Sequence, residues 1–308
     1  MSFVQRLINV QFNAAQSPSS TVNKFAESGT GQLTLSGLRI HCELTQAANP
    51  TFAHASLQIY GMTLSQMNQL GTFGMLHTFM ANNTIIIQAG DAQSGMYQVF
   101  NGQVQQAWAN FQGAPNVPFH VEAQALGVQQ VALVNPASYQ GKVPVTTIMQ
   151  SLASQMGLGF QNNGVQAQLN NPYFPGSAVS QCNQCAAAGA FNWNVDLSNN
   201  TLNIWPRGGS TNANAIIVGP PPIGSMIGYP TFTAAKMFVR NIFDARFKNG
   251  QKVTVQGSSI PVANGSWTIF GIKNTLEALM PHGAWESELE LSKISLGSSG
   301  QQSTLTAQ

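Results

Sequence analysis

The chain has 308 residues, enough for two or three domains, and its formal net charge is only +2. This small charge argues against a protein that binds nucleic acid through phosphate contacts, and three cysteines are too few for a disulfide framework. No stretch approaches the roughly 20 apolar residues of a membrane helix, and the first residues lack the apolar segment of a signal peptide.

Uncharged amides dominate the polar part of the composition. The sequence holds 27 asparagines and 31 glutamines against 12 basic and 10 acidic residues. Charged residues make up 7% of the chain, where an average domain has about 25%. Because neutral polar groups cost less to desolvate than charges, this composition favours a protein that neighbours cover in an assembly. A compositional bias of the source organism is the alternative.

The first third of the chain is predicted to be β-rich, with Gly, Asn and Pro between the strands. Residues 38–45 show the pattern: apolar and polar side chains alternate, which places Cys42 on the buried face. The predicted elements are strands at 3–12, 38–45, 56–61, 84–91 and 118–126, a short helix at 63–71, and a hairpin or bent pair within 96–112 around the turn dipeptide Asn101-Gly102.

The periodicity becomes helical near residue 143. Residues 143–160 place apolar side chains at helical spacing, and Thr146 or Thr147 can cap the helix start. A second helix is predicted over 178–188, followed by a hairpin over 191–206. After a Gly-rich linker the strands resume. They are predicted at 236–247, 249–258, 265–281 and 284–292, and the tail 296–308 is predicted to be flexible. The sequence therefore predicts a mainly β fold with an α+β insert.

Cys182 and Cys185 form a C-x-x-C pair inside the second predicted helix. A structural zinc site needs four ligands, and no second pair or nearby histidine is present. A redox pair normally opens a helix after a strand, whereas this pair follows a Pro/Gly-rich loop. The favoured interpretation is that both thiols pack as small apolar groups.

Two groups of charged residues are candidates for contacts between subunits. In the segment 285–291 the acids alternate with apolar residues, which favours a strand with one acidic face. The acids could instead form a solvated face or a cation site. The bases could instead form a phosphate-binding patch or simply occupy the outer positions of a strand. Neither group has an obvious partner nearby in the sequence, so pairing of the basic group with the acidic group between subunits is attractive. The candidates are Lys236, Arg240, Arg246, Lys248, Lys252, Glu286, Glu288 and Glu290.

No motif for catalysis or cofactor binding stands out. The sequence lacks a G-x-S-x-G elbow, a P-loop and a dinucleotide-binding glycine motif, and its five histidines are scattered. We therefore predict no enzyme activity, no catalytic, cofactor-binding or metal-binding residues, and no cofactor.

The order of segments along the chain is distinctive. The first β region carries SLQIYGMT, TIIIQAGD, YQVFNGQVQQA and FHVEAQAL, and the middle region carries VTTIMQSLASQMGL, AVSQCNQCAAAGAF and WNVDLSNNTLNIWP. The last region carries IGYPTFTAAKMFVRNIFDARFKNGQKVTVQG and GIKNTLEALMPHGAWESELEL. Together these segments resemble phage tail baseplate hub proteins. In that family's pattern, a histidine often stands where this sequence has Asn274.

The resemblance implies two tube-type β-barrel domains that flank a small helix–helix–hairpin domain. It places the barrels at 1–128 and 211–295 and the middle domain at 129–210. The implied function is a homotrimeric hub that connects the sixfold tail tube to the threefold central spike, like the hub region of type VI secretion spike proteins.

The partners implied are the tail tube protein, the central spike protein, other baseplate proteins and a tape measure protein, with no membrane and no specific nucleic acid. The implied location is the virion, after assembly in the host cytoplasm. A receptor- or carbohydrate-binding β protein and a tail-associated cell-wall hydrolase are the alternative functions.

Overall fold

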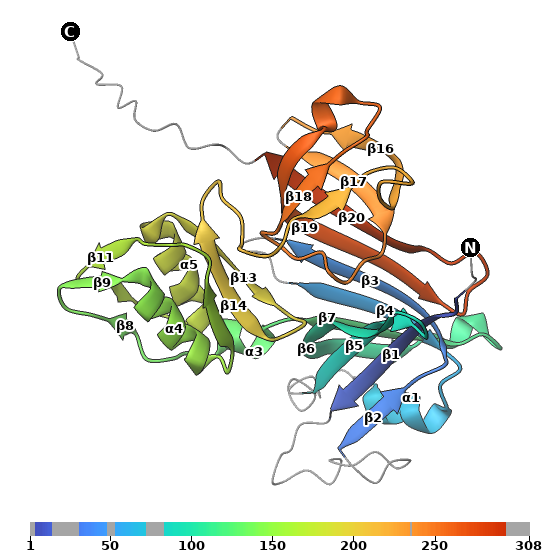
Figure 1. Cartoon of the computed structure of the whole chain (residues 1–308). Helices are drawn as coiled ribbons and strands as arrows, with labels where there is room; N and C mark the ends of the chain where they lie inside the picture. The colour runs from blue at the N-terminus through green and yellow to red at the C-terminus, as the bar shows by residue number, and fades with distance from the viewer. Residues whose placement is uncertain (1–3, 14–30, 48–52, 72–82, 235, 294–308) are drawn as a thin grey trace.

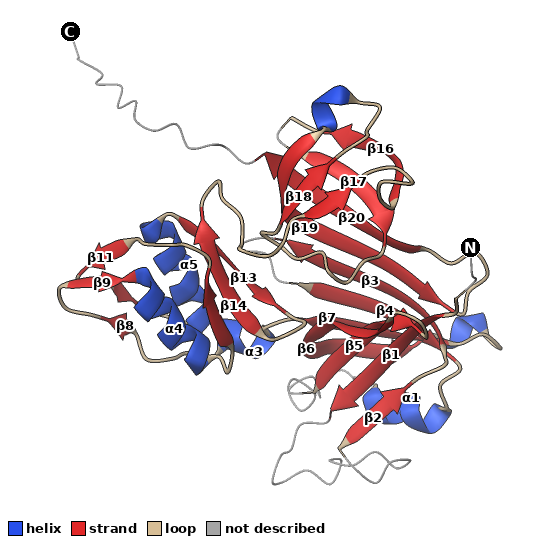
Figure 2. Ribbon diagram, viewed as in Figure 1, coloured by secondary structure: helices blue, strands red, loops and turns tan. Residues whose placement is uncertain are grey.

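The chain is mainly β, as the alternating patterns predict. The computed structural model describes residues 4–13, 31–47, 53–71, 83–234 and 236–293 (Figure 1). Within these residues, thirteen strands form one large sheet, and a group of helices and short strands lies beside it (Figure 2). This arrangement confirms the predicted fold class, a β-rich chain interrupted by an α+β insert.

The first β region follows the two-residue period of its sequence. β3 buries Ile40, Cys42 and Leu44 on one face. The residues between them, including His41 and Glu43, lie on the other face. The strands pair antiparallel in the order β3-β4-β7-β6-β5-β1-β2. The elements are β1 (Arg6–Asn13), β2 (Gln32–Leu35), β3 (Arg39–Ala47), β4 (His54–Tyr60), α1 (Leu64–Leu70), β5 (Thr84–Asp91), β6 (Gly95–Ala109), η2 (Phe111–Gly113) and β7 (Pro118–Gln124).

The predicted hairpin around Asn101-Gly102 is wrong. β6 continues through both residues from Gly95 to Ala109 and pairs with β5 on one side and β7 on the other. A Cβ atom on Gly102 would lie 2.8 Å from the ring of Phe100 and 2.6 Å from the carbonyl oxygen of Gln124. The glycine is therefore needed for a close approach within the sheet, and it marks no turn here.

The middle region contains two helices packed together against a small sheet. α4 (Val145–Gln155) and α5 (Ala178–Gly189) confirm the predicted helices, and β13 (Phe191–Asp196) pairs with β14 (Thr201–Pro206) as the predicted hairpin. The predicted cap of α4 is wrong, because the helix begins directly after Pro144. The remaining elements are α3 (Gly127–Val131), β8 (Ala137–Ser138), β9 (Lys142–Pro144), β10 (Gly159–Asn162), β11 (Gln168–Asn170) and β12 (Tyr173–Phe174).

The second β region extends the sheet of the first. β19 pairs with β3 on one side and with β20 on the other, so the sheet continues as β3-β19-β20-β17-β16. β18 joins β19 as a branch and pairs in parallel with β15. The elements are β15 (Ile216–Val218), β16 (Met226–Phe232), β17 (Met237–Ile242), β18 (Lys252–Val255), η3 (Pro261–Ala263), β19 (Gly265–Ala278) and β20 (Trp285–Lys293).

Two apolar cores share the long strand β19. Leu276 and Ala278 at its end belong to the core of the first β region and the middle region. Ile269 and Ile272 belong to the core of the second β region. The second β region is thus joined to the first through one strand. The boundaries predicted at 1–128, 129–210 and 211–295 and the closure of each β region into a barrel stay predictions, and the predicted tail lies outside the described residues.

Candidate functional site

The predicted basic and acidic groups meet on one face of the large sheet. β17 and β20 are antiparallel neighbours, with Arg240 in register with Glu288. Arg240 Nη2 donates a hydrogen bond to Glu286 Oε1 at 2.7 Å, and Lys236 Nζ pairs with the Glu290 carboxylate. The two groups therefore pair within one chain, although neither has a partner nearby in the sequence. Strand pairing brings together residues that lie 46 positions apart in the sequence.

The other predicted basic residues lie in different surroundings. Arg246 pairs with Asp244, two residues before it, at 2.6 Å. Partial burial opposes ionisation of Asp244, but the hydrogen bonds and charge of Arg246 outweigh it and lower the pKa of that carboxyl. Lys248 Nζ lies 3.2 Å from Asp196 Oδ1, on the middle region. Lys252, at the start of β18, forms no ion pair with any described residue.

All glutamates in the described part of the chain lie on the face of the sheet opposite the core. They come from β3, β7, β19 and β20, so the acidic face extends well beyond the predicted group on β20. Each of these side chains is partly buried. The six residues are Glu43, Glu122, Glu277, Glu286, Glu288 and Glu290.

Histidines and one lysine partner the acids that the sequence did not single out. His41 Nδ1 lies 2.8 Å from Glu277 Oε1, and His54 Nε2 lies 3.0 Å from Glu122 Oε2. Lys273 Nζ lies 3.1 Å from Glu43 Oε2. Sequence reasoning treated these histidines as scattered. The alternation in 38–45 places His41 on the outer face, but its partner is known only once β3 and β19 are known to be neighbours.

Glu288 differs from the two other predicted acids. It is in register with Arg240 on β17 and with Lys273 on β19. Each of these cations pairs with a different glutamate, and Glu288 forms no ion pair with a described residue. Among the described residues, its carboxylate therefore has no charged partner.

The C-x-x-C pair has the environment of packing residues. Cys182 and Cys185 are reduced and fully buried on α5. Burial raises the pKa of Cys185 to about 12 and raises that of Cys182 as well, so neither is a reactive thiolate at neutral pH. In the ranges that the structure describes, no three His, Cys, Asp or Glu side chains gather in a metal-binding arrangement. No helix in those ranges is long and apolar enough to cross a membrane.

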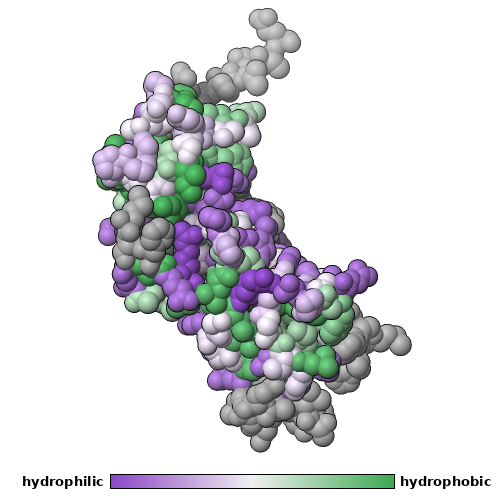
Figure 3. All heavy atoms as spheres, turned by 90° about the vertical axis from the view of Figure 1, so that its right-hand side faces the viewer, coloured by the Kyte–Doolittle hydropathy of each residue, from purple (hydrophilic) through white to green (hydrophobic). Residues whose placement is uncertain are grey.

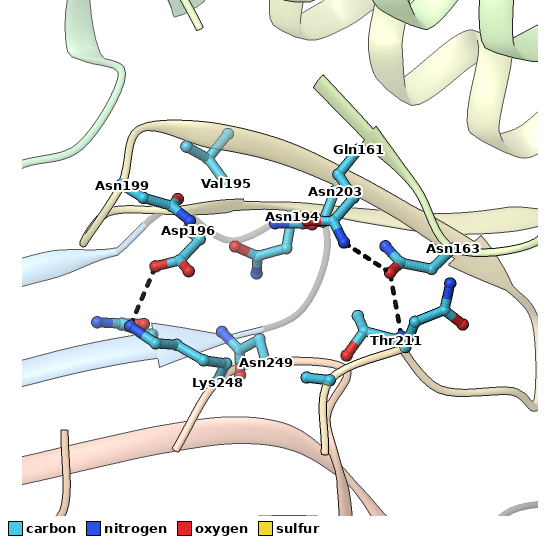
Figure 4. A pocket seen from close by; sticks show the side chains of 13 residues that line it. Gln161, Asn163, Asn194, Val195, Asp196, Asn199, Asn203, Thr211, Lys248 and Asn249 are labelled. Atoms are coloured by element: carbon cyan, nitrogen blue, oxygen red, sulfur yellow. Dashed lines mark hydrogen bonds and ion pairs between the residues drawn. The ribbon is translucent and has the colours of Figure 1, made fainter. Parts of the chain in front are cut away.

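A cleft lined by amides lies where the three regions meet (Figure 4). Its volume is 270 Å³, and its walls come from the β13–β14 hairpin, the end of β3, and two loops of the second β region. Asn163 Oδ1 accepts a hydrogen bond from the backbone N–H of Asn212 at 3.0 Å, which ties the middle region to one of these loops. The sequence showed the abundance of amides but not their convergence at this junction.

The comparison that decides the family is a match over most of the chain. A family model described as "Baseplate hub gp41" matches residues 20–278. The chain belongs to the baseplate hub gp41 family. Membership gives this hub protein a structural role in a phage tail baseplate, which places it in the virion with other tail proteins and supports a non-enzymatic role. No curated protein matches the hub protein in sequence.

Solved structures share the fold of the hub protein. The 43 kDa tail protein of prophage MuSo2 from Shewanella oneidensis has a TM-score of 0.60 at 9% identity, over 94% of this chain and 97% of that chain. A tail protein of Neisseria meningitidis MC58 has a TM-score of 0.57 at 10% identity, over 93% and 96%.

A third solved structure comes from a secretion system. The E. coli c3393 protein, a component of the type VI secretion system with structural similarity to the T4 tail proteins gp27 and gp5, has a TM-score of 0.55 at 10% identity. The alignment covers 84% of this chain and 74% of that chain. At these identities the likeness shows a common fold, which is the fold of tail and spike proteins.

Proposed function

We propose that the hub protein assembles as a homotrimer that connects the sixfold tail tube to the threefold central spike. The observation that carries this proposal is the single sheet in which β19 holds two β regions, each facing its own apolar core. Three such chains around one axis present six β regions. The six β regions can therefore contact a sixfold ring on one side of the trimer. The threefold symmetry of the trimer matches a threefold partner on the other side.

The proposed partners are the tail tube protein, the central spike protein, other baseplate proteins and a tape measure protein. The likeness of the fold to the c3393 protein supports a place next to a spike, because that protein resembles gp27 and gp5. Assembly takes place in the host cytoplasm in this proposal, before the tail is complete.

The exposed apolar residues support the proposal that neighbours cover the chain. Leu133 and Val131 in the middle region are 84% and 77% exposed, and Tyr229 on the edge strand β16 is 71% exposed. Figure 3 shows hydrophobic residues in separate patches among hydrophilic ones on one side of the molecule. Interfaces of this mixed kind suit a protein with several partners better than one with a single large apolar contact.

Among the eight predicted contact residues, Glu288 and Lys252 are the best candidates for subunit contacts. Neither forms an ion pair with a described residue of its own chain. The other six residues already have partners, so a contact that uses them has to share or replace an existing pair. We therefore propose that Glu288 and Lys252 contact basic and acidic groups, respectively, on neighbouring subunits.

The test is the mass and symmetry of the purified protein. Light scattering after size-exclusion chromatography is expected to give about 98 kDa for the protein alone, three times the 32.8 kDa of one chain. If the trimer forms only with its partners, the complex with tube and spike proteins is expected to contain three copies of this chain. Averaged electron micrographs are expected to show a threefold ring with six lobes. A chain that stays monomeric in every mixture, or a ring of another order, would overturn the proposal.

A further inference from the structure

The amide cleft has the chemistry of a binding site for an uncharged, hydrogen-bonding ligand. Eight of its thirteen lining residues are asparagine or glutamine, from all three regions of the fold. Asn194, Asn203 and Asn249 are labelled among the side chains that line it in Figure 4. Its 270 Å³ is room for about nine water molecules or a few residues of an extended chain.

Buried polar atoms in the cleft have no partner in the described part of the chain. They are the hydroxyl oxygen of Thr211 and both polar atoms of the Asn249 side-chain amide. Buried polar groups in folded proteins nearly always have a hydrogen-bond partner. These atoms lie just beneath the surface of the cleft. Once the Asn249 side chain turns into the cleft, a ligand that offers both a donor and an acceptor, as each peptide group does, would satisfy its amide at both atoms.

The charges of the cleft select for a neutral ligand. Among the described residues that line it, Lys248 and Asp196 are the charged ones, and they pair with each other at 3.2 Å. Lys248 Nζ also donates to the hydroxyl of Ser198 at 2.7 Å. None of the described lining residues is aromatic, so they offer a sugar ring no flat apolar surface to pack on. A polypeptide segment with hydroxyl and amide side chains fits this lining better than an ion or a sugar.

The end of this chain has the required composition and begins next to the cleft. Residues 294–308 contain no charged side chain, and nine of the fifteen are Ser, Thr or Gln. The residue before them, Lys293, lines a neighbouring cleft together with Asn192 of β13. Asn192 lies four residues before Asp196 on the same face of β13, which is about 13 Å at the rise of a strand. Fifteen residues can span up to roughly 50 Å.

We propose that the amide cleft binds the uncharged C-terminal segment 294–308 of a copy of this chain. Peptide groups of the segment pair with Asn249 and Thr211, and its Ser, Thr and Gln side chains pair with the other amides of the cleft. Docking of this segment fastens the middle region to the second β region. The inference rests on the cleft and does not depend on the trimeric hub.

A photo-crosslinking experiment on the full chain tests this proposal. A benzoyl-phenylalanine at position 301 is activated by light, and the linked peptides are identified by mass spectrometry. Crosslinks are expected at residues 194–203, 211–213 and 248–249. Mixing ¹⁵N-labelled with unlabelled chains separates the two sources of the segment, because a segment from another copy gives crosslinks of mixed isotope. Crosslinks that are absent or that scatter over other surfaces would overturn the proposal.

Matched variants show whether the cleft itself holds the segment. Asn249→Leu and Thr211→Val are each expected to reduce crosslinking at the cleft at least fivefold, whereas Asn170→Leu on the exposed strand β11 leaves it unchanged. Equal crosslinking in all three would contradict the proposal. If a cleft variant does not fold, hydrogen exchange on the unaltered chain decides. Amides of 294–308 are expected to exchange at least tenfold more slowly than in a synthetic peptide of the same sequence, and equal rates would mean that the cleft holds water only.

Discussion

Asn274 Oδ1 accepts a hydrogen bond from the hydroxyl of Ser287 at 2.7 Å, and both side chains are buried. The two residues are in register on β19 and β20. Ile272 beside them belongs to the second core, and Leu276 belongs to the first. This polar pair therefore marks the boundary between the two apolar cores of one continuous sheet.

Removing one member of this pair is expected to destabilise the fold. Asn274→Ala leaves the buried hydroxyl of Ser287 without its acceptor, which costs about 1–3 kcal/mol. Urea unfolding followed by tryptophan fluorescence measures the change. Asn170→Ala on the exposed strand β11 serves as the control and is expected to change stability by less than about 0.5 kcal/mol. A loss for Asn274→Ala no larger than that of the control would contradict the role given to the pair.

Gly102→Ala is expected to destabilise the first β region. A Cβ atom there would meet the backbone carbonyl of Gln124 and the ring of Phe100 at distances below 3 Å. Overpacking of this kind costs about 1–3 kcal/mol. Gly113→Ala is the matched control, because nothing lies within 4 Å of a Cβ atom at that position. The comparison needs only thermal melts of the two variants, and equal melting temperatures would show that β6 adapts to the methyl group.

Chelators and thiol reagents are expected to leave the folded protein unchanged. Cys42, Cys182 and Cys185 are buried free thiols, so we expect none to bind metal or react while the chain is folded. EDTA should shift the melting temperature by less than about 2 °C. A colorimetric thiol titration should count no reactive group in buffer and three in guanidinium chloride. A fall of several degrees with EDTA would point to a metal at the C-x-x-C pair.

The buried thiols also predict how stability depends on pH. The pKa of Cys185 is raised from 9.0 to about 12 in the folded chain. The stability that follows from this shift is fully present below pH 9 and is lost as the pH rises towards 12, because only the unfolded chain ionises. The difference in unfolding free energy between the unaltered protein and Cys185→Ala should shrink in this range by up to about 1.4 kcal/mol per pH unit. If the difference in unfolding free energy between the two proteins stayed constant from pH 8 to 11, the Cys185 thiol would not be the cause of the pH dependence.

The ion pairs on the sheet face are expected to add little to stability. Glu286→Gln breaks the pair with Arg240, whose side chain is 52% exposed. Exposed pairs are worth about 0–1 kcal/mol, so the variant should unfold within about 1 kcal/mol of the unaltered protein. Urea denaturation checks this value. A loss above 2 kcal/mol would mean that the pair supports the sheet itself.

The variant Glu288→Gln tests assembly without disturbing the fold. Glu288 forms no ion pair with a described residue of its own chain, and the neutral amide adds no repulsion towards Arg240 and Lys273 beside it, so the unfolding midpoint should stay nearly unchanged. If Glu288 faces a basic group of a neighbouring subunit, loss of its charge should weaken association at least fivefold, as measured by sedimentation velocity. Unchanged association would remove Glu288 from the proposed subunit contact and leave Lys252 to be tested in the same way.

The elements were predictable from sequence wherever one local signal decided them. Alternation gave β3, and Thr63 and Gln66 cap each other at the start of α1. The two helices and the hairpin of the middle region were also predicted. The dipeptide Asn101-Gly102 led to a wrong prediction of a turn, because residues that favour a turn also permit a close backbone approach within a strand. Only the contact with Phe100 and Gln124 distinguishes these roles, and that contact is not local in sequence.

The candidate site was predictable only in part. The sequence suggested that the basic group with Arg240 pairs with the acids of 286–290 between subunits. It did not show that Arg240 and Glu286 pair within one chain, since strand order decides which residues are neighbours. His41 and Glu277 lie 236 positions apart, and no local pattern joins them. The amide cleft could not be predicted from the sequence either, because its walls come from three regions that are far apart along the chain.

The continuity of β19 has a mechanical consequence. To tilt one β region against the other, the chain would have to break hydrogen bonds with β3 or with β20, or separate the two cores that share this strand. Each subunit should therefore behave as a stiff body under load. If a trimer of such stiff subunits binds a sixfold ring on one side and a threefold partner on the other, the mismatch in symmetry has to be absorbed at the interfaces between molecules. The fold of each subunit then stays unchanged.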